Sequence, residues 1–310
     1  MAMSRTTRVL VTGAGGQVGV DLLDTLRGVT PLGGDPAFQP DAKSVGSDEF
    51  EVLGLDRHDL DVTDRDAVLH SLRAARPDVV VHLAAYTAVD RAEVDVETCF
   101  NVNEHGTENM SRGAQDVGAH LITISTDYVF DGTKGSAYVE DDVTRPLSVY
   151  GASKRDGERH CLPADTVVRT SWVMGVRGKN VVHVIASRAL SGSTVRFVDD
   201  QMGTVTSASD LARALVSLVR ERPGGVWHVA NSGATTWYDV AEHVGTLLGR
   251  VGEFATPIRT SELSPAPLAT RPARSDLDTG KFATSFAALP AWRDAVARLV
   301  FDLRPDKVTP

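Results

Sequence analysis

The stretch Arg8-Val-Leu-Val-Thr-Gly-Ala-Gly-Gly-Gln-Val-Gly19 decides the fold of this chain. Its first five residues are largely apolar and β-branched, which predicts a buried strand, and Gln17 to Arg27 predicts a helix. Gly13, Gly16 and Gly19 lie at the junction. The first glycine allows a sharp turn, the second leaves room for a pyrophosphate, and the third lets the helix pack closely on the sheet. This stretch therefore predicts a dinucleotide site.

The strand and helix on either side of the glycines are stronger evidence for a nucleotide site than the glycines alone. Their spacing here is Gly-x-x-Gly-x-x-Gly, whereas the common dinucleotide fingerprint is Gly-x-Gly-x-x-Gly. A glycine-rich turn alone is weak evidence for a nucleotide site. Placed between an N-terminal apolar strand and a helix, it predicts that free N–H groups at the helix start face the phosphates.

Short apolar runs alternate with amphipathic stretches along the first half of the chain. We expect further strands at 51–55, 78–82, 121–125 and 166–169, and a second helix at 64–75. This alternation predicts an α/β fold, a Rossmann-like, doubly wound parallel sheet with helices on both faces. Gly28 to Phe50, rich in Gly, Pro, Asp and Ser, is interpreted as a surface insertion.

The pattern loosens after about residue 169, where all four Trp residues lie. We expect helices at 180–190, 208–219, 238–248 and 292–300, and a strand at 226–229. We therefore predict two domains. A Rossmann domain covers residues 1–168, to which segments at about 193–230 return, and a smaller C-terminal α/β domain covers 169–310 and lines a ligand cleft.

The composition excludes several classes of protein. The 310 residues contain 41 Asp and Glu against 32 Lys and Arg, a net charge of −9, whereas nucleic-acid-binding proteins present a basic face. A few local arginines can still bind an anionic small molecule. Cys99 and Cys161 are too few for a disulfide scaffold and lack metal-ligand spacing, so we predict reduced thiols in a cytoplasmic protein. No signal peptide, membrane span or nucleic-acid partner is expected.

Residues that select the cofactor are expected where the second strand ends. Asp56 can accept a hydrogen bond from a ribose 2′-hydroxyl, which favours NAD, and Arg57 can contact a 2′-phosphate, which favours NADP. These two residues leave the choice open. Asp61 and Val62 follow, where an adenine ring could bind, and the alternative interpretation of this segment is the N-cap region of the next helix.

Tyr150 and Lys154 lie four residues apart, which places both on one face of a helix. Tyrosine ordinarily titrates near pH 10, and a neighbouring ammonium lowers that pKa. We therefore expect Tyr150 to exchange a proton with a carbonyl or alkoxide near neutral pH, and Lys154 to bind the nicotinamide ribose. The alternative is an exposed pair with no function.

A hydroxyl follows the apolar run 121–125, at the end of a strand where open α/β sheets bind ligands. Thr126 can donate a hydrogen bond to the same substrate oxygen that Tyr150 protonates. Asp127 can bind sugar hydroxyls or, equally well, close an Asx turn.

Together these motifs resemble the extended short-chain dehydrogenase/reductase family, and within it the dTDP-4-dehydrorhamnose reductases. The resemblance extends from Val9 to about Lys281 and includes several motifs in the same order. The motifs are Leu83-Ala-Ala-Tyr-Thr-Ala-Val-Asp90, Ser125 to Gly132, Tyr150 to Lys154 with Gly157-Glu158, Arg169-Thr-Ser-Trp-Val173, Asp200-Gln-Met-Gly203 and Arg271-Pro-Ala-Arg-Ser275.

The resemblance implies a reaction and roles for individual residues. The reaction is reduction of a dTDP-linked 4-keto-6-deoxy sugar, dTDP-4-dehydrorhamnose, to dTDP-L-rhamnose with NADPH or NADH. The cofactor would lie on Gly16, Gln17, Val18 and Ala84, Ala85, Tyr86. Thr126, Tyr150 and Lys154 would be catalytic.

The same resemblance suggests how the sugar nucleotide binds. Thr126, Asp127 and Trp172 would contact the sugar nucleotide. The candidates for its pyrophosphate are Arg177, Lys179, Arg271 and Arg274, since guanidinium forks suit phosphate. A monomer or homodimer is expected, and Mg²⁺ is suggested by family analogy alone, because no carboxylate cluster in the sequence requires it.

Some features leave alternatives open. His82-Leu83 replaces the usual Asn-Cys or Asn-Ala, and Val205 stands where proline is common. Both departures concern the identity of the sugar more than the reaction. A reductase or epimerase for another nucleotide-linked deoxysugar and a non-catalytic, cofactor-binding regulatory subunit remain alternatives. Dehydratases on this fold use Thr-Asp-Glu, whereas Tyr128 replaces the Glu here.

Overall fold

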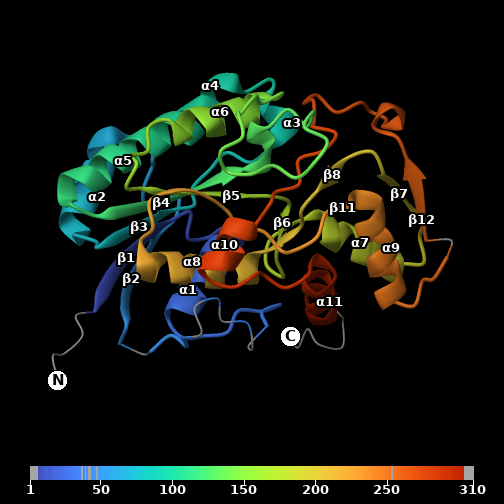
Figure 1. Ribbon diagram of the computed structural model, residues 1–310, viewed down its shortest axis with the longest axis horizontal. Coiled ribbons are helices and arrows are strands. Elements are labelled where there is room, and N and C mark those ends of the chain that lie inside the picture. Colours follow the sequence, from blue (N-terminus) through green and yellow to red (C-terminus); the bar gives the residue numbers. More distant parts are fainter. Residues whose placement is uncertain are drawn as a thin grey trace.

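A six-stranded parallel sheet forms the centre of the computed structural model (Figure 1). The structure describes residues 6–35, 38, 40, 43–46, 48–252 and 254–303. The strand order is β10-β5-β4-β3-β1-β2. The strands are β1 (Thr7–Thr12), β2 (Phe50–Leu55), β3 (Val79–His82), β4 (His120–Thr126), β5 (Thr166–Thr170) and β10 (Gly225–His228). The predicted doubly wound parallel sheet is confirmed.

The strand order reverses between β1 and β3, so the chain leaves β1 toward β2 on one side and continues through β3 on the other. Such a switch point opens a crevice at the carboxyl ends of the strands, where α/β proteins bind their ligands. Thr12 pairs in register with Leu55 of β2 and His82 of β3. The turns that follow these three strands therefore lie side by side.

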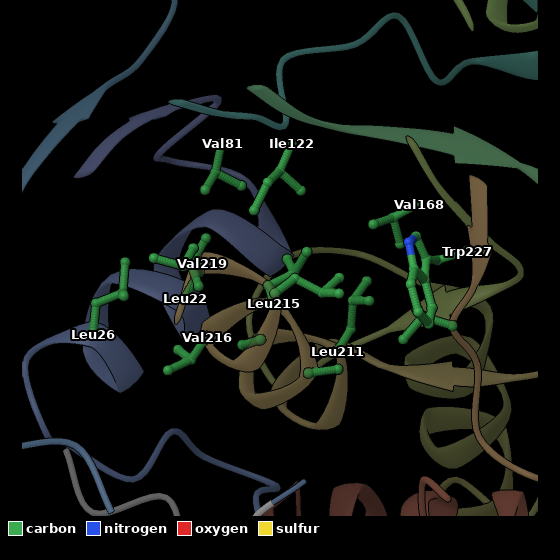
Figure 2. Packing of buried hydrophobic residues seen from close by; sticks show 14 of the residues in the cluster. Leu22, Leu26, Val81, Ile122, Val168, Leu211, Leu215, Val216, Val219 and Trp227 are labelled. Atoms are coloured by element: carbon green, nitrogen blue, oxygen red, sulfur yellow. The ribbon is translucent and has the colours of Figure 1, made fainter. Parts of the chain in front are cut away.

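Helices cover both faces of the sheet (Figure 1). One face is covered by α2 (Arg65–Ala75), α5 (Gly106–Val117) and α6 (Val149–Glu158), and the other by α1 (Gln17–Leu26) and α8 (Ala208–Glu221). Figure 2 shows how α1 and α8 close the second face: Leu22, Leu211 and Leu215 pack together beneath Val81 and Ile122 of the sheet. Alternating strand residues thus enter two separate apolar layers.

Side chains at the helix ends explain why these helices begin where the sequence predicts. Asp64 caps α2 and accepts hydrogen bonds from the N–H groups of Asp66 and Ala67 at 3.0 Å each. Ser148 caps α6 by accepting from Gly151 at 3.1 Å. These caps satisfy N–H groups that have no partner within the helix.

The later half of the chain builds a smaller part beside the sheet. Its helices are α7 (Val181–Leu190), α9 (Trp237–Leu247) and α11 (Trp292–Asp302), whereas α10 (Gly280–Ser285) packs beside β10 and its Phe282 joins the core of the main sheet. Its short strands pair as β6 (Val173–Met174) with β9 (Thr206–Ser207), β7 (Val195–Val198) with β12 (Ala255–Ile258), and β8 (Met202–Gly203) with β11 (Thr235–Thr236). Within the segment 193–230, β10 pairs with β5 in the central sheet and α8 packs on that sheet, whereas β7 pairs with β12.

The segment over 28–50, interpreted as a surface insertion, packs against α8. Residues 36, 37, 39, 41, 42 and 47 of it lie outside the described part of the chain. Phe38 is buried in the core, and its carbonyl accepts a hydrogen bond from Arg213 of α8 at 3.1 Å. Arg220, also on α8, pairs with Glu49 at 2.6 Å. The segment therefore covers a helix as well as lying on the surface.

Candidate active site

The glycine turn after β1 has the shape that its sequence predicts. Gly13 has a φ of +67°, and a Cβ atom there would lie 2.7 Å from the backbone nitrogen of Ala84. A Cβ on Gly19 would lie 2.3 Å from the carbonyl oxygen of Gly13, so this glycine does allow α1 to approach the turn closely. The first N–H groups of α1 have no acceptor inside the helix, and Gly15 and Gly16 are exposed. This turn fits a pyrophosphate.

The candidate ribose and adenine residues follow β2, beside the glycine turn. Asp56 accepts a hydrogen bond from the N–H of His58 at 2.7 Å, which orients its carboxylate. Arg57 is exposed. Asp61 closes an Asx turn with Thr63, whose N–H and hydroxyl donate at 2.9 and 2.8 Å, and these bonds lower the pKa of Asp61. The helix cap in this segment is Asp64, so the N-cap alternative does not apply to Asp61 itself.

The segment from Ala84 to Tyr86 follows the end of β3. It lies on the opposite side of the glycine turn from β2. Asn103 holds this segment, because its side chain accepts from the N–H of Tyr86 at 2.8 Å and donates to its carbonyl at 3.0 Å. The Asn103 amide also donates to the Ser153 hydroxyl of α6 at 3.0 Å. Asn103 lies in a π-helical turn, Asn101–His105, a conformation that often marks functional sites. It links the β3 loop to the helix that bears Tyr150.

Tyr150 and Lys154 share one face of α6, as predicted. The helix lies close to the end of β4, since a Cβ on Gly151 would fall 2.2 Å from the carbonyl oxygen of Tyr128. The rings of Tyr128 and Tyr150 meet edge to face at 6.2 Å. The Thr126 side chain is near enough to the Tyr150 phenol to lower its pKa, against the larger effect of burial. Thr126 and Tyr150 are thus adjacent, as predicted from their motifs.

The expected low pKa of Tyr150 is wrong for the protein by itself. Burial raises the pKa of this phenol above its ordinary value, and the negative charge of Asp127 raises it further. Burial also lowers the pKa of Lys154 to about 8, although the nearby carboxylate of Glu158 opposes this shift. The expected lowering by Lys154 does not act on the Tyr150 phenol here, and burial of the phenol dominates its pKa.

His82 lies beneath this site, at the end of β3. It is buried, and its Nδ1 lies 2.8 Å from the Thr12 hydroxyl. Burial, aided by the charge of Lys154, lowers the pKa of His82 to about 3. This departure from the usual family residue therefore adds a neutral ring beside Lys154.

Asp127 is almost completely enclosed. Its carboxylate accepts hydrogen bonds from Ser275 at 2.5 Å and from Thr126 at 3.1 Å. Burial is the main cause that raises the pKa of Asp127 to about 6, and both hydroxyls oppose this shift. In the protein by itself the side chain joins two chain segments and closes no Asx turn.

A cavity of about 520 Å³, open to solvent, lies mainly among residues of the later half of the chain. It is lined by Asp90, Val181, Arg196, Phe197, Val198, Gln201, Trp237, Leu263, Ser264, Pro265, Ala266, Pro267, Leu268 and Arg271. Arg271 pairs with Asp90 of α3 (Val89–Ala92) through two bonds of 2.6 and 3.1 Å. The charge of Arg271 also acts on the Tyr128 phenol, which places the cavity next to the Tyr128 and Tyr150 rings.

Trp172 stands behind one wall of this cavity. Its ring stacks on that of Trp237 at 4.3 Å, and Trp237 lines the cavity. Trp172 has a φ of +42°, which is rare for a bulky residue and is found where the surrounding structure enforces it. This strained tryptophan therefore supports the cavity wall.

Comparison with known proteins identifies the family. The model described as RmlD substrate binding domain matches residues 42–304. A protein of Sinorhizobium fredii named dTDP-4-dehydrorhamnose reductase is 34% identical over 310 residues, which cover 96% of this chain and 97% of that protein. The chain belongs to the RmlD family.

Other RmlD relatives agree in sequence and structure. A Streptomyces niveus protein named dTDP-4-keto-6-deoxy-D-glucose reductase is 36% identical, with 86% of this chain and 87% of that protein covered. The crystal structure of dTDP-4-dehydrorhamnose reductase from Bacillus anthracis in complex with NADP is 29% identical. It superposes with a TM-score of 0.84 over 96% of this chain and 100% of its own. This RmlD family member is therefore an oxidoreductase of the Rossmann-like type.

The four basic candidates for a substrate pyrophosphate separate in the structure. Arg271 lines the cavity. Arg274 instead pairs with Asp276 at 2.7 Å, and Arg177 pairs with Asp24 of α1 at 2.7 Å. Lys179 is exposed and does not line the cavity. Of these four, Arg271 is the residue in position to contact a ligand in the cavity.

Several residues that line the cavity were missed from the sequence, among them Asp90, Arg196, Phe197 and Trp237. Asp90 and Gln201 lie inside stretches that resemble the family, which is a signal that could have found them. Arg196 and Phe197 lie on β7, where alternation alone does not indicate which ligand a side chain meets.

Within the described ranges, no group of three or more His, Cys, Asp and Glu residues could hold a metal ion. No helix in the described part of the chain has the length and apolar character needed to cross a membrane.

Proposed function

We propose that this chain reduces the 4-keto group of a dTDP-4-keto-6-deoxyhexose, with dTDP-4-dehydrorhamnose as the substrate and dTDP-L-rhamnose as the product. The observation that carries the proposal is the position of Thr126 and Tyr150. Tyr150 lies edge to face with Tyr128, the phenol of Tyr128 is influenced by Arg271 of the cavity lining, and Thr126 ends β4 at the edge of the sheet where the glycine turn follows β1. The names of the RmlD relatives support this substrate class.

NADPH is the proposed cofactor. The glycine turn leaves its phosphates in reach of the first N–H groups of α1, and Arg57 is exposed beside the expected ribose position, where it can pair with a 2′-phosphate. A related structure holds NADP. When bound, the cofactor supplies a hydride to the carbonyl carbon of the sugar.

Two residues of the chain act on the oxygen of that carbonyl. Thr126 donates a hydrogen bond to it and Tyr150 transfers its proton to the oxygen as negative charge develops there. The high pKa of Tyr150 keeps this proton in place until the substrate oxygen becomes basic. Lys154, one helical turn further along α6, stabilises the phenolate that remains.

The cavity holds the nucleotide part. Arg271 is oriented by its paired bonds to Asp90, and an in-plane N–H group that these bonds do not use can donate to a phosphate oxygen. Trp237, fixed by its stacking on Trp172, presents an aromatic surface to a base or sugar ring. The predicted contact of Asp127 with sugar hydroxyls remains a proposal.

A second candidate function differs from the first in the identity of the sugar. The Streptomyces niveus relative is named for a different 4-keto-6-deoxy sugar. The alternative is therefore the same reduction on another dTDP-linked deoxysugar, and the two candidates differ in the stereochemistry of the product. The expectations of a monomer or homodimer and of a cytoplasmic location stay predictions.

The test measures NADPH oxidation with enzymatically prepared dTDP-4-keto-6-deoxy sugars, followed by identification of the product sugar. We expect oxidation with dTDP-4-dehydrorhamnose and formation of dTDP-L-rhamnose. Oxidation with a different epimer alone would favour the second candidate, and no oxidation with any such sugar would contradict the proposal. The same assay with NADH, for wild type and for Arg57→Ala, tests the cofactor: the variant should lose its preference for NADPH and keep its activity with NADH.

A further inference from the structure

A hydrogen bond between Gln17 and Asn180 joins the phosphate-binding turn to the wall of the cavity. Gln17 is the first residue of α1, and its side-chain oxygen accepts a hydrogen bond from the Asn180 amide at 3.0 Å. Asn180 is the N-cap of α7, where it accepts from the N–H of His183 at 3.3 Å. The next residue, Val181, lines the cavity. One side-chain contact thus lies between the two proposed binding sites.

The loop from 175 to 180 is shaped to receive the Gln17 side chain. Gly178 has a φ of +81°, and a Cβ there would lie 2.7 Å from Cγ of Gln17. The Asn180 amide also donates to the Gly175 carbonyl at 2.8 Å, and the His183 ring lies 3.0 Å from the same oxygen. The loop is therefore closed on itself around the glutamine.

A second contact ties this loop to α1. Arg177 donates a 2.7 Å hydrogen bond to Asp24 and lies 3.8 Å from the carboxylate of Asp21, both on α1. In Figure 1, α1 lies below the sheet and α7 lies among the elements of the later half. The loop bridges these two parts at both the first and the third turn of α1.

We infer that Asn180 is a positioning residue that couples cofactor binding to binding of the sugar nucleotide. This inference rests on the proposed function. A phosphate bound to the N–H groups of α1 orders the turn that bears Gln17, and Gln17 in turn holds Asn180 and the start of α7. A nucleotide in the cavity packs on Val181 and orders the same contact from the other side. The ligand that binds second then loses less conformational entropy on binding. Each ligand therefore raises the affinity of the protein for the other by the same factor.

The coupling is measured by calorimetric titration of dTDP into the protein, with and without saturating NADP⁺. For the wild type we expect dTDP to bind at least about 5-fold more tightly when NADP⁺ is present, the lower end of typical coupling. Asn180→Ser retains an N-cap hydroxyl but is too short to reach Gln17. Its ratio of dissociation constants should fall to near one.

Three further variants separate coupling from a general loss of structure. Gln17→Met keeps the side-chain volume and the backbone N–H but has no amide oxygen, so its ratio should also fall to near one. Combined with Asn180→Ser it should cause no further fall, because both changes remove the same bond. Arg73→Ala removes an exposed ion pair with Asp116 between α2 and α5, on the face of the sheet opposite α1, and should retain the wild-type ratio.

Two results would overturn the inference: a wild-type ratio of one with both ligands bound, or Asn180→Ser with the wild-type ratio. A wild-type protein that binds neither NADP⁺ nor dTDP would contradict the proposed function, and this inference with it. The two failures are therefore distinguishable in a single set of titrations.

Discussion

The hydroxyl of Ser275 donates a 2.5 Å hydrogen bond to the buried carboxylate of Asp127, from 148 positions further along the chain. Asp127 directly follows Thr126 at the end of β4, and Ser275 belongs to the segment that begins at Arg271. This bond therefore attaches the strand that presents Thr126 to the segment that borders the cavity. It holds the catalytic and nucleotide-binding parts of the proposed site together.

Removal of this donor should destabilise the protein. Ser275→Ala leaves a buried carboxylate with one partner fewer, which costs about 1–3 kcal/mol. Urea denaturation measures the free energy of unfolding. Ser285→Ala is the matched control, because that serine is exposed at the end of α10, and its effect should stay within about 0.5 kcal/mol. Equal stability of the two variants would show that the bond contributes nothing.

Substitution of Tyr150 should separate chemistry from binding. Tyr150→Phe keeps the ring against Tyr128 and removes the proton that the carbonyl oxygen receives. We expect turnover to fall by about 10²–10⁴-fold, while the dissociation constant for NADPH stays near that of wild type. Single-turnover NADPH oxidation and fluorescence titration of the cofactor provide the two measurements. Reduction at the wild-type rate would exclude Tyr150 as the proton donor.

The pH dependence of the reaction should reflect Lys154. Burial lowers the pKa of its ammonium to about 8, so the charged form is present below that pH and is lost as the pH rises through it. The charge stabilises the Tyr150 phenolate, and we therefore expect kcat/KM for NADPH to decline above about pH 8. A pH profile of kcat/KM reports the free enzyme. A profile that stays flat well above this pH would contradict the assignment, and Lys154→Met should lack the decline.

Arg271 and Arg274 should differ in their effect on the substrate. Arg271 lines the cavity, whereas Arg274 pairs with Asp276 outside the cavity lining. Arg271→Ala should raise KM for the sugar nucleotide by about 10-fold or more, because a charge-assisted bond contributes about 1.5–3 kcal/mol. Arg274→Ala should leave this KM within about 2-fold. Initial-rate kinetics at saturating NADPH test both, and the reverse order of effects would place the phosphate elsewhere.

Much of the sheet and its ligand-binding edge could be predicted from the sequence. Buried parallel strands are continuous apolar runs, and a helix must follow each one, so β1 and α1 appear within a residue or two of their predicted bounds. The neighbourhood of Thr126 and Tyr150 followed from the same rule, since strand ends and helix starts meet at one edge of the sheet. The helix predicted at 64–75 matches α2 to within one residue, because Asp64 is its N-cap.

Other features had no local signal. β7 pairs with β12, about sixty residues further along the chain. The sequence pattern of a short strand does not indicate which distant strand it will pair with. The raised pKa of Tyr150 was missed because burial depends on what covers the ring, whereas the sequence shows only the neighbouring lysine. The contact of Gln17 was missed for the same reason. Its side chain packs into the loop from 175 to 180, and the glycine motif gives no indication of that loop.

The strand, glycine turn and helix that open the chain follow from the sequence alone, because each rests on the conformational limits of consecutive residues. The sequence also determined that Tyr150 and Lys154 share a helix face. Only the tertiary structure decided which arginine of Arg271-Pro-Ala-Arg274 borders the cavity. Asp90, 181 positions away, orients Arg271, while Asp276 binds Arg274. Arg274 thus pairs with a neighbour two residues along the chain, whereas the partner of Arg271 lies on a distant segment that only the fold brings close.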